Sequence, residues 1–427
     1  MSALAMLREF SGVAMMAYNV STQRTAMPWD VQPDMRQVFP WWQFIVLIVA
    51  AASPMICPAQ NSAPGNSANL TYEQRTAQGI QQLQSWYDQG TGLYRTTGWW
   101  NSANAITTLA NYSQATRSRR YEPVFHNTFT AAQKTSDGFL NQFYDDEGWW
   151  ALAWIDVYDL TNQKRYLSMA ESIFADMAKG WDDKCSGGIW WSKDRKYKNA
   201  IANELFLSVA AHLATRARSG WQRKNYLRWA QREWLWFSQS GMINSDHLIN
   251  DGLDQHCTNN RKNTWTYNQG VILGGLSELY RGVHDPSLLT EAGSIAASTL
   301  SSPFLTDPQG ILHDVCEPNC GADGTQFKGI FVRNLRLLDE VAPSARYKDF
   351  AETNALSIWK GMHPPKYGIG ESWSLPYGPA NASTQGSGED VLVALIFMRG
   401  MRKETPETLA CEHNALRGRT CAAQLTR

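Results

Sequence analysis

Six short turns rich in glycine or aromatic residues recur along the chain, and each leads into an apolar helical stretch. A second kind of segment, amphipathic and moderately charged, stands between them with apolar residues at helical spacing. The turns and the helix starts behind them lie at residues 98–104, 148–154, 189–205, 264–270, 326–331 and 387–392. The amphipathic segments lie at residues 71–88, 122–141, 163–179, 222–239, 286–300 and 343–360. This spacing indicates one helical unit repeated six times with variable loops.

Alternation of apolar and amphipathic helices predicts two concentric layers, because the apolar helices must be covered on all sides. Closing the layers into a ring avoids exposed apolar ends. Period-2 patterns of useful length are scarce, so strands are not expected. We therefore predict an all-α fold, an (α/α)6 barrel of alternating inner and outer helices. The aromatic turns would then open all the inner helices at one end and gather tryptophan, asparagine, glutamine and aspartate side chains in one cleft.

The composition favours a globular protein that handles uncharged ligands. The 427 residues are 43% hydrophobic, and 39 acidic residues balance 39 basic ones. Nothing in that balance favours nucleic acid or an anionic membrane. The 19 tryptophans exceed ordinary core use, because tryptophan is rarely fully buried and serves as a flat apolar platform with a polar N–H. Sugars, whose C–H faces stack on such platforms, are the expected ligands.

An apolar run at residues 41–52 is too short for a comfortable membrane span and reads as the core of a signal peptide. Because a basic start precedes it, we expect the chain to begin at Met35, with 1–34 a mis-assigned or disordered extension and 35–60 the signal peptide. A signal anchor that is not cleaved is the alternative. Residues 61–70 read as a linker, 71–405 as the catalytic domain and 406–427 as a tail without an apolar segment, where we expect no lipid anchor. These features predict a secreted protein, with cell-wall association a further option.

Seven cysteines fit the secretory route, because six remain when Cys57 is set aside with the signal region. Local pairing favours Cys316 with Cys320 and Cys411 with Cys421, which leaves Cys185 with Cys257, although six cysteines permit fifteen connectivities. Three glycosylation sequons add to this expectation. They begin at Asn69, Asn111 and Asn381.

Asp145 and Asp146 are adjacent carboxylates that directly precede an apolar, aromatic helical run. Like charges near apolar surface do not both stay ionised, so one carboxyl should keep its proton at higher pH than the other. A proton donor beside a carboxylate is what sugar hydrolysis requires. The alternative is that both aspartates only stabilise the start of the following helix.

Three ordered motifs resemble glycoside hydrolase family 76. They are Tyr-Asp-Asp-Glu-Gly-Trp-Trp-Ala-Leu-Ala-Trp at 144–154, Trp-Thr-Tyr-Asn-Gln-Gly-Val at 265–271 and Gln-Phe-Lys-Gly-Ile-Phe-Val-Arg at 326–333. The likeness covers nearly all of residues 71–400. This family comprises endo-α-1,6-mannanases and related fungal cell-wall enzymes. The resemblance therefore implies an (α/α)6 barrel and a retaining mechanism. It also implies Asp145 as the nucleophile and Asp146 as the acid/base.

Adjacency of the two aspartates agrees with retention. Consecutive α-carbons lie about 3.8 Å apart, so the carboxyl groups more readily reach the roughly 5–5.5 Å of retaining enzymes than the roughly 6.5–9.5 Å of inverting ones. Neighbours inside a helix point about 100° apart, so we expect the pair at a loop or helix opening. Gly148 would permit a turn there.

The predicted substrate-binding residues come from the same turns. As sugar platforms or, alternatively, core residues we name Trp99, Trp149, Trp150, Trp190, Trp191 and Trp265. Asn203, from the third turn, completes the candidate set. Tyr267, Asn268 and Gln269 would hydrogen-bond sugar hydroxyls or cap the fourth inner helix. Lys328 and Arg333 would meet a substrate oxygen or phosphate, or pair with a buried acid.

Other acidic and basic residues carry weaker indications. Asp182 and Asp183 read as a loop, with calcium contact a weak alternative. Asp156 and Asp159 share one helix face and would support the site or face solvent. The histidines form no serine-hydrolase pattern, no Cys/His spacing suits zinc and no phosphate-loop or dinucleotide pattern is present. We therefore predict no metal and no cofactor.

Together these features predict a secreted, monomeric retaining endo-α-1,6-mannosidase with α-1,6-linked mannan or mannooligosaccharide as substrate and no nucleic-acid partner. A cell-wall transglycosylase that acts on mannose-bearing glycolipid anchors is the first alternative. A non-catalytic mannan-binding wall protein is the second. An enzyme for uronic-acid polymers would want more basic residues in the cleft.

Overall fold

The computed structural model describes residues 70–400. The first helix of each pair is α1 (Tyr72–Gln84), α3 (Glu122–Ala131), α5 (Lys164–Met177), α7 (Gly220–Gln239), α9 (Pro286–Ser301) or α12 (Ala345–Gly361). The second helix is α2 (Trp99–Thr116), α4 (Tyr144–Thr161), α6 (Ala200–Arg216), α8 (Thr266–Val283), α11 (Phe327–Val341) or α13 (Ala382–Arg399). Short elements fill the loops: β1 (Tyr87–Asp88) pairs antiparallel with β2 (Leu93–Tyr94), and α10 (Gly321–Gly324) precedes α11.

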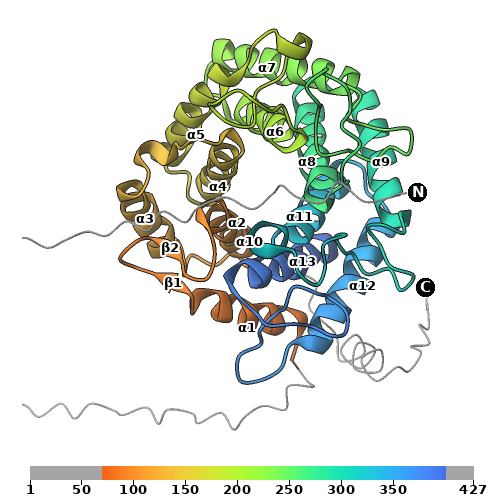
Figure 1. The fold of residues 1–427 in the computed structure, drawn as a ribbon. Helices are drawn as coiled ribbons and strands as arrows, with labels where there is room; N and C mark the ends of the chain where they lie inside the picture. The colour runs from red at the N-terminus through yellow and green to blue at the C-terminus, as the bar shows by residue number, and fades with distance from the viewer. Residues whose placement is uncertain (1–69, 401–427) are drawn as a thin grey trace, which may run out of the picture. The chain divides into compact units, whose positions relative to one another are not determined.

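The helices form two concentric rings (Figure 1). Helices α2, α4, α6, α8, α11 and α13 make the inner ring, and α1, α3, α5, α7, α9 and α12 surround it. Each inner helix packs against its inner neighbours, as in the extensive α6–α8 and α8–α11 contacts. The predicted (α/α)6 barrel is confirmed.

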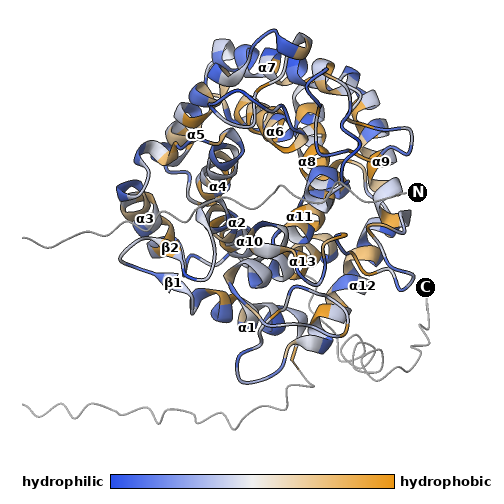
Figure 2. Cartoon of the chain, in the orientation of Figure 1, coloured by the Kyte–Doolittle hydropathy of each residue, from blue (hydrophilic) through white to orange (hydrophobic). Residues whose placement is uncertain are grey.

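The sequence pattern explains which helix lies in which ring. Helix α6 is buried along almost its whole length, as expected for a helix that is apolar on all sides. Helix α7 buries only a stripe that includes Tyr226, Ala230 and Phe237 and exposes the rest. Figure 2 shows the same division, with hydrophobic residues concentrated on the inner ring and toward it.

The helix starts differ from the expected turns at two places. Helix α4 begins at Tyr144, so Gly148 lies inside the helix and forms no turn. A Cβ at Gly148 would stand 2.7 Å from the Leu205 side chain, so the glycine allows α4 to approach α6 closely. Helix α13 likewise begins at Ala382, before the expected turn at 387–392.

Two of the three expected disulfides lie in the described residues, and both are formed. Cys185 is bonded to Cys257 and Cys316 to Cys320. The remaining expected features lie outside the described residues: Cys57, the Cys411–Cys421 pair, Asn69, the segments 1–34 and 35–60, nearly all of 61–70 and all of the tail 406–427. No helix within residues 70–400 is long and apolar enough to cross a membrane.

One sequon does not suit glycosylation in the folded chain. Asn111 is 3% exposed, and its amide is bound to Asp156 and Arg336 inside the barrel. Asn381 caps α13, with its side chain accepting from the Thr384 N–H.

Candidate active site

A cavity of about 430 Å³ lies at the end of the barrel where the inner helices begin. Helix starts of α2, α4, α8 and α11 contribute to it, together with the loops before α4, α6, α8 and α11. Its lining residues are Trp100, Phe143, Asp145, Asp146, Trp149, Trp191, Tyr197, Asn199, Asp251, Tyr267, Asp323 and Phe327. The lining contains four aspartates and no lysine, arginine or histidine among the described residues. The cavity is therefore acidic and aromatic.

Asp145 and Asp146 lie in the first turn of α4, behind the N-cap residue Phe143. The Trp191 Nε1–H donates to Asp145 Oδ2 at 2.9 Å, and the Asp146 N–H donates to Asp145 Oδ1 at 3.1 Å. Asn141 Nδ2 donates to Asp146 Oδ2 at 2.5 Å. Since each carboxylate has its own donor, the two groups are held separately while facing one cavity.

The surroundings of the pair favour a single shared proton. Burial, followed by repulsion from Asp146, raises the pKa of Asp145 to about 8. Burial also raises the pKa of Asp146 to about 6, with a smaller contribution from the charge of Asp323. Two interacting carboxyl groups lose their protons in steps that belong to the pair. Near neutral pH the pair therefore holds one proton, as acid/base chemistry at a glycosidic bond requires.

A buried ionic group supports the pair from behind. Glu147 is fully buried and receives Lys193 Nζ at 2.8 Å, and the same ammonium lies 2.7 Å from Asp176. The Asn141 N–H donates to Glu147 Oε1 at 3.3 Å. Asn141 thus connects this group to Asp146 and holds the loop that precedes α4.

Two further aspartates occupy the other walls. Asp251 accepts from the Tyr197 hydroxyl, and Asp323 in α10 accepts from Trp100 Nε1 at 2.8 Å. The Cys316–Cys320 disulfide closes the segment just before α10. Both carboxylates can also accept hydrogen bonds from a hydroxyl-bearing ligand.

Aromatic side chains in pairs form the flat walls of the cavity. Tyr267 stacks on Phe327 with ring centroids 3.8 Å apart and an interplanar angle of 14°. Trp100 stacks near Trp149 at 5.6 Å, and Phe143 lies 5.0 Å from Trp191. Trp191 is placed by backbone bonds, because the Tyr144 N–H donates to its carbonyl at 2.9 Å. Such surfaces suit the C–H faces of sugars.

The structure brings five of the predicted site residues together at this cavity: Asp145, Asp146, Trp149, Trp191 and Tyr267. The remaining candidates do not line it. Trp150 is fully buried and packs on Trp154, Trp99 packs on Phe139 and Trp150, and the Trp190 Nε1–H donates to Asp182 at 2.6 Å. Trp265 contacts the edge of Phe327.

Two of the three amide side chains among the candidates bond the backbone. Asn203 is fully buried and bonds the N–H and carbonyl of Ile189 and the carbonyl of Asn199. Gln269 does the same for Ile249 and also donates to the Trp265 carbonyl. Asn268 is fully buried, and neither its nitrogen nor its oxygen has a hydrogen-bond partner.

The two cationic candidates pair with acids, of which Glu317 is partly buried and Asp390 is buried. Lys328 Nζ lies 2.6 Å from Glu317, and Arg333 Nη1 lies 2.8 Å from Asp390. Arg333 also donates to Asn104 at 2.6 Å, and so joins α2, α11 and α13. In the second acidic doublet, Asp182 receives Lys198 Nζ at 2.8 Å.

Sequence reasoning missed seven lining residues: Trp100, Phe143, Tyr197, Asn199, Asp251, Asp323 and Phe327. Trp100 and Phe327 stand in the recognised turns beside residues that were chosen. Adjacent helix positions point about 100° apart, and the sequence does not say which one faces the cleft. Asp251 and Asp323 lie in loops without periodicity and carry no comparable signal.

Comparison with known proteins places this geometry in a family. The family model described as glycosyl hydrolase family 76 matches residues 70–408. The chain belongs to glycosyl hydrolase family 76. Mannan endo-1,6-α-mannosidase DFG5 of Candida albicans is 26% identical over 349 residues, which cover 74% of this chain and 76% of that protein. Mannan endo-1,6-α-mannosidase DCW1 of Saccharomyces cerevisiae is 27% identical over 57% of this chain, which spans 60% of the length of that relative.

Solved structures of the family share the fold. An inactive variant of the α-1,6-mannanase GH76A of Salegentibacter, in complex with α-1,6-mannotetrose, matches with a TM-score of 0.70 at 23% identity. The match covers 77% of this chain and 100% of that chain. Dfg5 from Chaetomium thermophilum, in complex with glucosamine, matches with a TM-score of 0.68 at 19% identity and covers 81% of this chain and 97% of that one. These likenesses establish the common (α/α)6 architecture.

Proposed function

We propose that the chain is a retaining endo-α-1,6-mannosidase that cleaves α-1,6-mannan backbones. The observation that carries the proposal is the placement of Asp145 and Asp146 side by side at the start of α4, facing an acidic, aromatic cavity. Adjacent residues keep their carboxyl groups near the roughly 5–5.5 Å separation of retaining enzymes.

The proposed reaction has two displacements. In the first, the Asp145 carboxylate attacks the anomeric carbon while Asp146 protonates the departing glycosidic oxygen. A covalent mannosyl ester on Asp145 results. In the second, Asp146 takes a proton from water, whose oxygen displaces Asp145 and restores the original anomeric configuration.

The two roles require the shared proton to stand on Asp146 when substrate is bound. In the empty cavity the larger pKa rise belongs to Asp145. The Trp191 indole and the Asp146 N–H both donate to Asp145 and so favour its ionised form. A glycosidic oxygen beside Asp146 would accept its proton as a hydrogen bond. We infer that substrate draws the proton to Asp146.

The lining supports a neutral sugar substrate. Trp149, Trp191 and Tyr267 offer apolar faces, while the carboxylates of Asp251 and Asp323 offer hydrogen-bond acceptors for hydroxyl groups. A polymer of uronic acids would meet four aspartates without a cationic partner from the described lining residues. The names of the curated relatives support mannan in particular. So does the mannotetrose complex, in which two consecutive aspartates are replaced.

Azide rescue tests both the activity and the roles. An aryl α-1,6-mannobioside with a good leaving group would be given to Asp145→Ala and Asp146→Ala variants with sodium azide. The Asp146→Ala variant should form the α-mannosyl azide through the intermediate on Asp145, and Asp145→Ala should form the β-azide directly. The opposite anomers would reverse the assigned roles. Full activity of either variant toward mannan without azide would refute the assigned roles. Absence of any cleavage of α-1,6-mannan by the parent chain would favour the mannan-binding alternative.

Transglycosylation is the second candidate, with another sugar replacing water in the second displacement. The cavity holds two carboxylates beyond the catalytic pair, and a related fungal Dfg5 has been solved with glucosamine, an amino sugar. These observations favour an acceptor or donor that includes a cationic sugar, as in a mannose-bearing glycolipid anchor. Chromatography of products from α-1,6-mannan, with and without a second glycan, decides between the two. Dominance of longer or glycan-linked products would establish transfer, and short mannooligosaccharides alone would establish hydrolysis.

We extend the proposal to secretion of the enzyme. Both disulfides within the described residues are formed, and disulfides persist mainly in oxidising compartments. The proposed signal peptide at 35–60 leads there. Mass spectrometry of the mature protein should find its N-terminus after residue 50, and a peptide from before that residue would contradict cleavage.

A further inference from the structure

A second and larger cavity, of about 730 Å³, lies at the opposite end of the barrel. We call it the distal cavity. Residues from the middle and last turns of α2, α4, α6, α8 and α11 line it, together with Arg223 of α7 and Phe397 of α13. The proposed active site is instead built at the first turns of the inner helices. Its volume falls in the range of roughly 300–1,000 Å³ that is typical of small-molecule sites.

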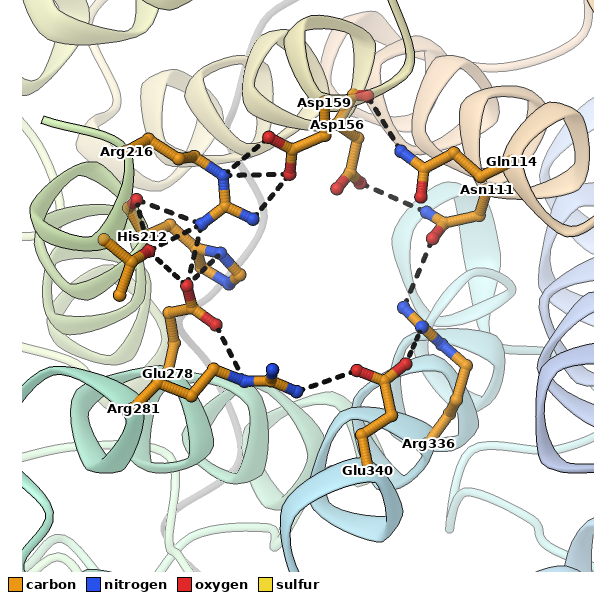
Figure 3. Close-up of polar contacts among 11 residues, drawn as sticks. Asn111, Gln114, Asp156, Asp159, His212, Arg216, Glu278, Arg281, Arg336 and Glu340 are labelled. Atoms are coloured by element: carbon orange, nitrogen blue, oxygen red, sulfur yellow. Dashed lines mark hydrogen bonds and ion pairs between the residues drawn. The ribbon is translucent and has the colours of Figure 1, made fainter. Parts of the chain in front are cut away.

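A chain of ion pairs starts on one side of the distal cavity (Figure 3). Arg216 Nε donates to both oxygens of Asp159 at 2.8 Å, and its Nη1 donates to Glu278 at 2.7 Å. Arg281 lies 3.4 Å from the other oxygen of Glu278 and 2.8 Å from Glu340. Helix C-termini carry partial negative charge, so the arginines are favoured here even before they are paired.

This series of polar contacts continues to helices α11 and α2 and returns to α4. Glu340 pairs with Arg336, whose Nη2 donates to Asn111 Oδ1 at 3.2 Å. Asn111 Nδ2 donates to Asp156 Oδ2 at 3.1 Å. Asp156 stands one turn before Asp159, the residue at which this series of contacts began. Acids and bases thus alternate around an opening, and each arginine of the set is paired with a carboxylate.

Two side chains in or beside this closed series of ion pairs keep free hydrogen-bonding capacity. His212 is 7% exposed and lines the cavity, but its Nδ1 has no hydrogen-bond partner. The nearby Glu278 oxygen stands 3.8 Å away, beyond hydrogen-bond length. Burial lowers the pKa of His212 to about 4, so the imidazole is neutral, and in the tautomer with its hydrogen on Nε2 the Nδ1 atom accepts a hydrogen bond. Asp156 has an amide partner in Asn111 and no ion pair with a described residue.

The class of ligand follows from the alternation of acidic and basic side chains around the distal cavity. An anion would face the carboxylates of this set, and a cation would face its arginines. A sugar hydroxyl donates one hydrogen bond and accepts others, so a polyol can satisfy both kinds of group without adding charge. Leu152, Ile155 and Leu337 supply apolar surface for its C–H groups.

We propose that the distal cavity binds a neutral polyhydroxylated ligand of the hexose or short-oligosaccharide class, with Asp156 and His212 Nδ1 accepting hydrogen bonds from its hydroxyl groups. The site is separate from the proposed catalytic cavity and does not depend on catalysis there. A free sugar and the end of a longer glycan share this chemistry.

Nuclear magnetic resonance of the histidine rings tests the proposal in the full chain. The Asp145→Asn, Asp146→Asn double variant, labelled with ¹⁵N-histidine and ¹⁵N-tryptophan, would be titrated with mannose, α-1,6-mannobiose and polymeric α-1,6-mannan. The His212 Nδ1 resonance should shift and saturate. The Trp191 indole reports the catalytic cavity independently, so failure of the proposed function and failure of the distal site are distinguishable. Saturation by mannobiose indicates a free-sugar site, and saturation only by the polymer indicates a chain-end site.

Variants and charged sugars complete the test. His212→Leu and Asp156→Asn should each weaken binding at least about tenfold, since each removes an acceptor. His212→Asn, which keeps a polar atom near the Nδ1 position, should retain more affinity than His212→Leu. Because His212→Leu alters a buried site, thermal unfolding is measured for each variant, and Asp156→Asn carries the test if the leucine variant does not fold. Absence of a His212 shift with every neutral sugar, or tighter binding of glucuronate or glucosamine than of mannose, would overturn the proposal.

Discussion

Asp145 and Asp146 are held in a cavity that disfavours their charged forms, and their raised pKa values make folding stability depend on pH. Between about pH 4 and pH 8 the native state binds more protons than the unfolded chain, so the free energy of unfolding decreases as the pH rises. Asparagine at both positions removes this dependence. We expect the double variant to melt a few degrees above the parent at pH 8 and within about 1 °C of it at pH 4.

Calorimetry at the two pH values measures this difference. Asp183→Asn is the matched control, because this aspartate lies outside the cavity. An equal gain in melting temperature at both pH values would show that the pair is not held at raised pKa.

In the proposed reaction Asn141 acts as a positioning residue, because its amide donates to Asp146. That hydrogen bond favours the ionised carboxylate, so its loss should raise the pKa of Asp146 further. We expect Asn141→Leu to lower kcat/KM by about 10- to 100-fold. The alkaline limb of the pH profile should move to higher pH, because Asp146 keeps its proton longer.

Asn127→Leu is the control for this variant, since Asn127 bonds Tyr87 and the Gln89 carbonyl away from the cavity. A uniform loss of rate without movement of the pH profile would indicate that Asn141 only maintains the loop.

At the scale of elements, glycines set how closely the inner helices pack. A Cβ at Gly329 in α11 would stand 2.3 Å from the Ser387 carbonyl oxygen of α13, and one at Gly270 in α8 would stand 2.5 Å from the Phe331 Cα. Backbone atoms of a packed helix cannot move aside separately. Gly329→Ala should therefore destabilise the fold by about 1–3 kcal/mol in denaturant unfolding.

Gly220→Ala provides the contrast, because nothing lies within 4 Å of a Cβ at that position in α7. It should be neutral or should stabilise by up to about 1 kcal/mol. If both variants unfold at the same denaturant concentration, close helix approach is not what Gly329 provides.

Periodicity predicted which helices exist and in which layer each lies, whereas it misplaced the starts of the inner helices α4 and α13. The expected outer segments 222–239 and 286–300 agree closely with α7 (Gly220–Gln239) and α9 (Pro286–Ser301). The turn expected at 148–154 lies inside α4. A glycine such as Gly148 suggests a turn locally. Inside α4, however, its lack of a side chain makes room for Leu205.

At the scale of the molecule, the disulfides differ in how much chain they constrain. Cys185–Cys257 spans 72 residues, and Cys316–Cys320 spans 4. Loop-closure entropy predicts about 4 kcal/mol of stabilisation for the first and about 2 kcal/mol for the second. Denaturant unfolding of the two double-serine variants measures these values.

The double-serine variant at Cys316 and Cys320 should also raise KM. The bond that it removes closes the segment just before α10, and α10 carries Asp323 to the cavity. A larger loss of stability from the short loop than from the long one would contradict this division.

The sequence alone determined the number and order of helical pairs, the two-layer arrangement and the adjacent aspartates, because periodicity and neighbouring positions are properties of the chain itself. It also placed Trp149, Trp191 and Tyr267 among the residues that line one cavity. Only the tertiary structure decided that Arg333 and Lys328 pair with acids, that Asp251 and Asp323 line the proposed active site and that Asp156 belongs to the distal cavity. Those outcomes depend on which side of a helix faces the barrel axis and on where aperiodic loops return, and both are set by contacts between residues far apart in the chain.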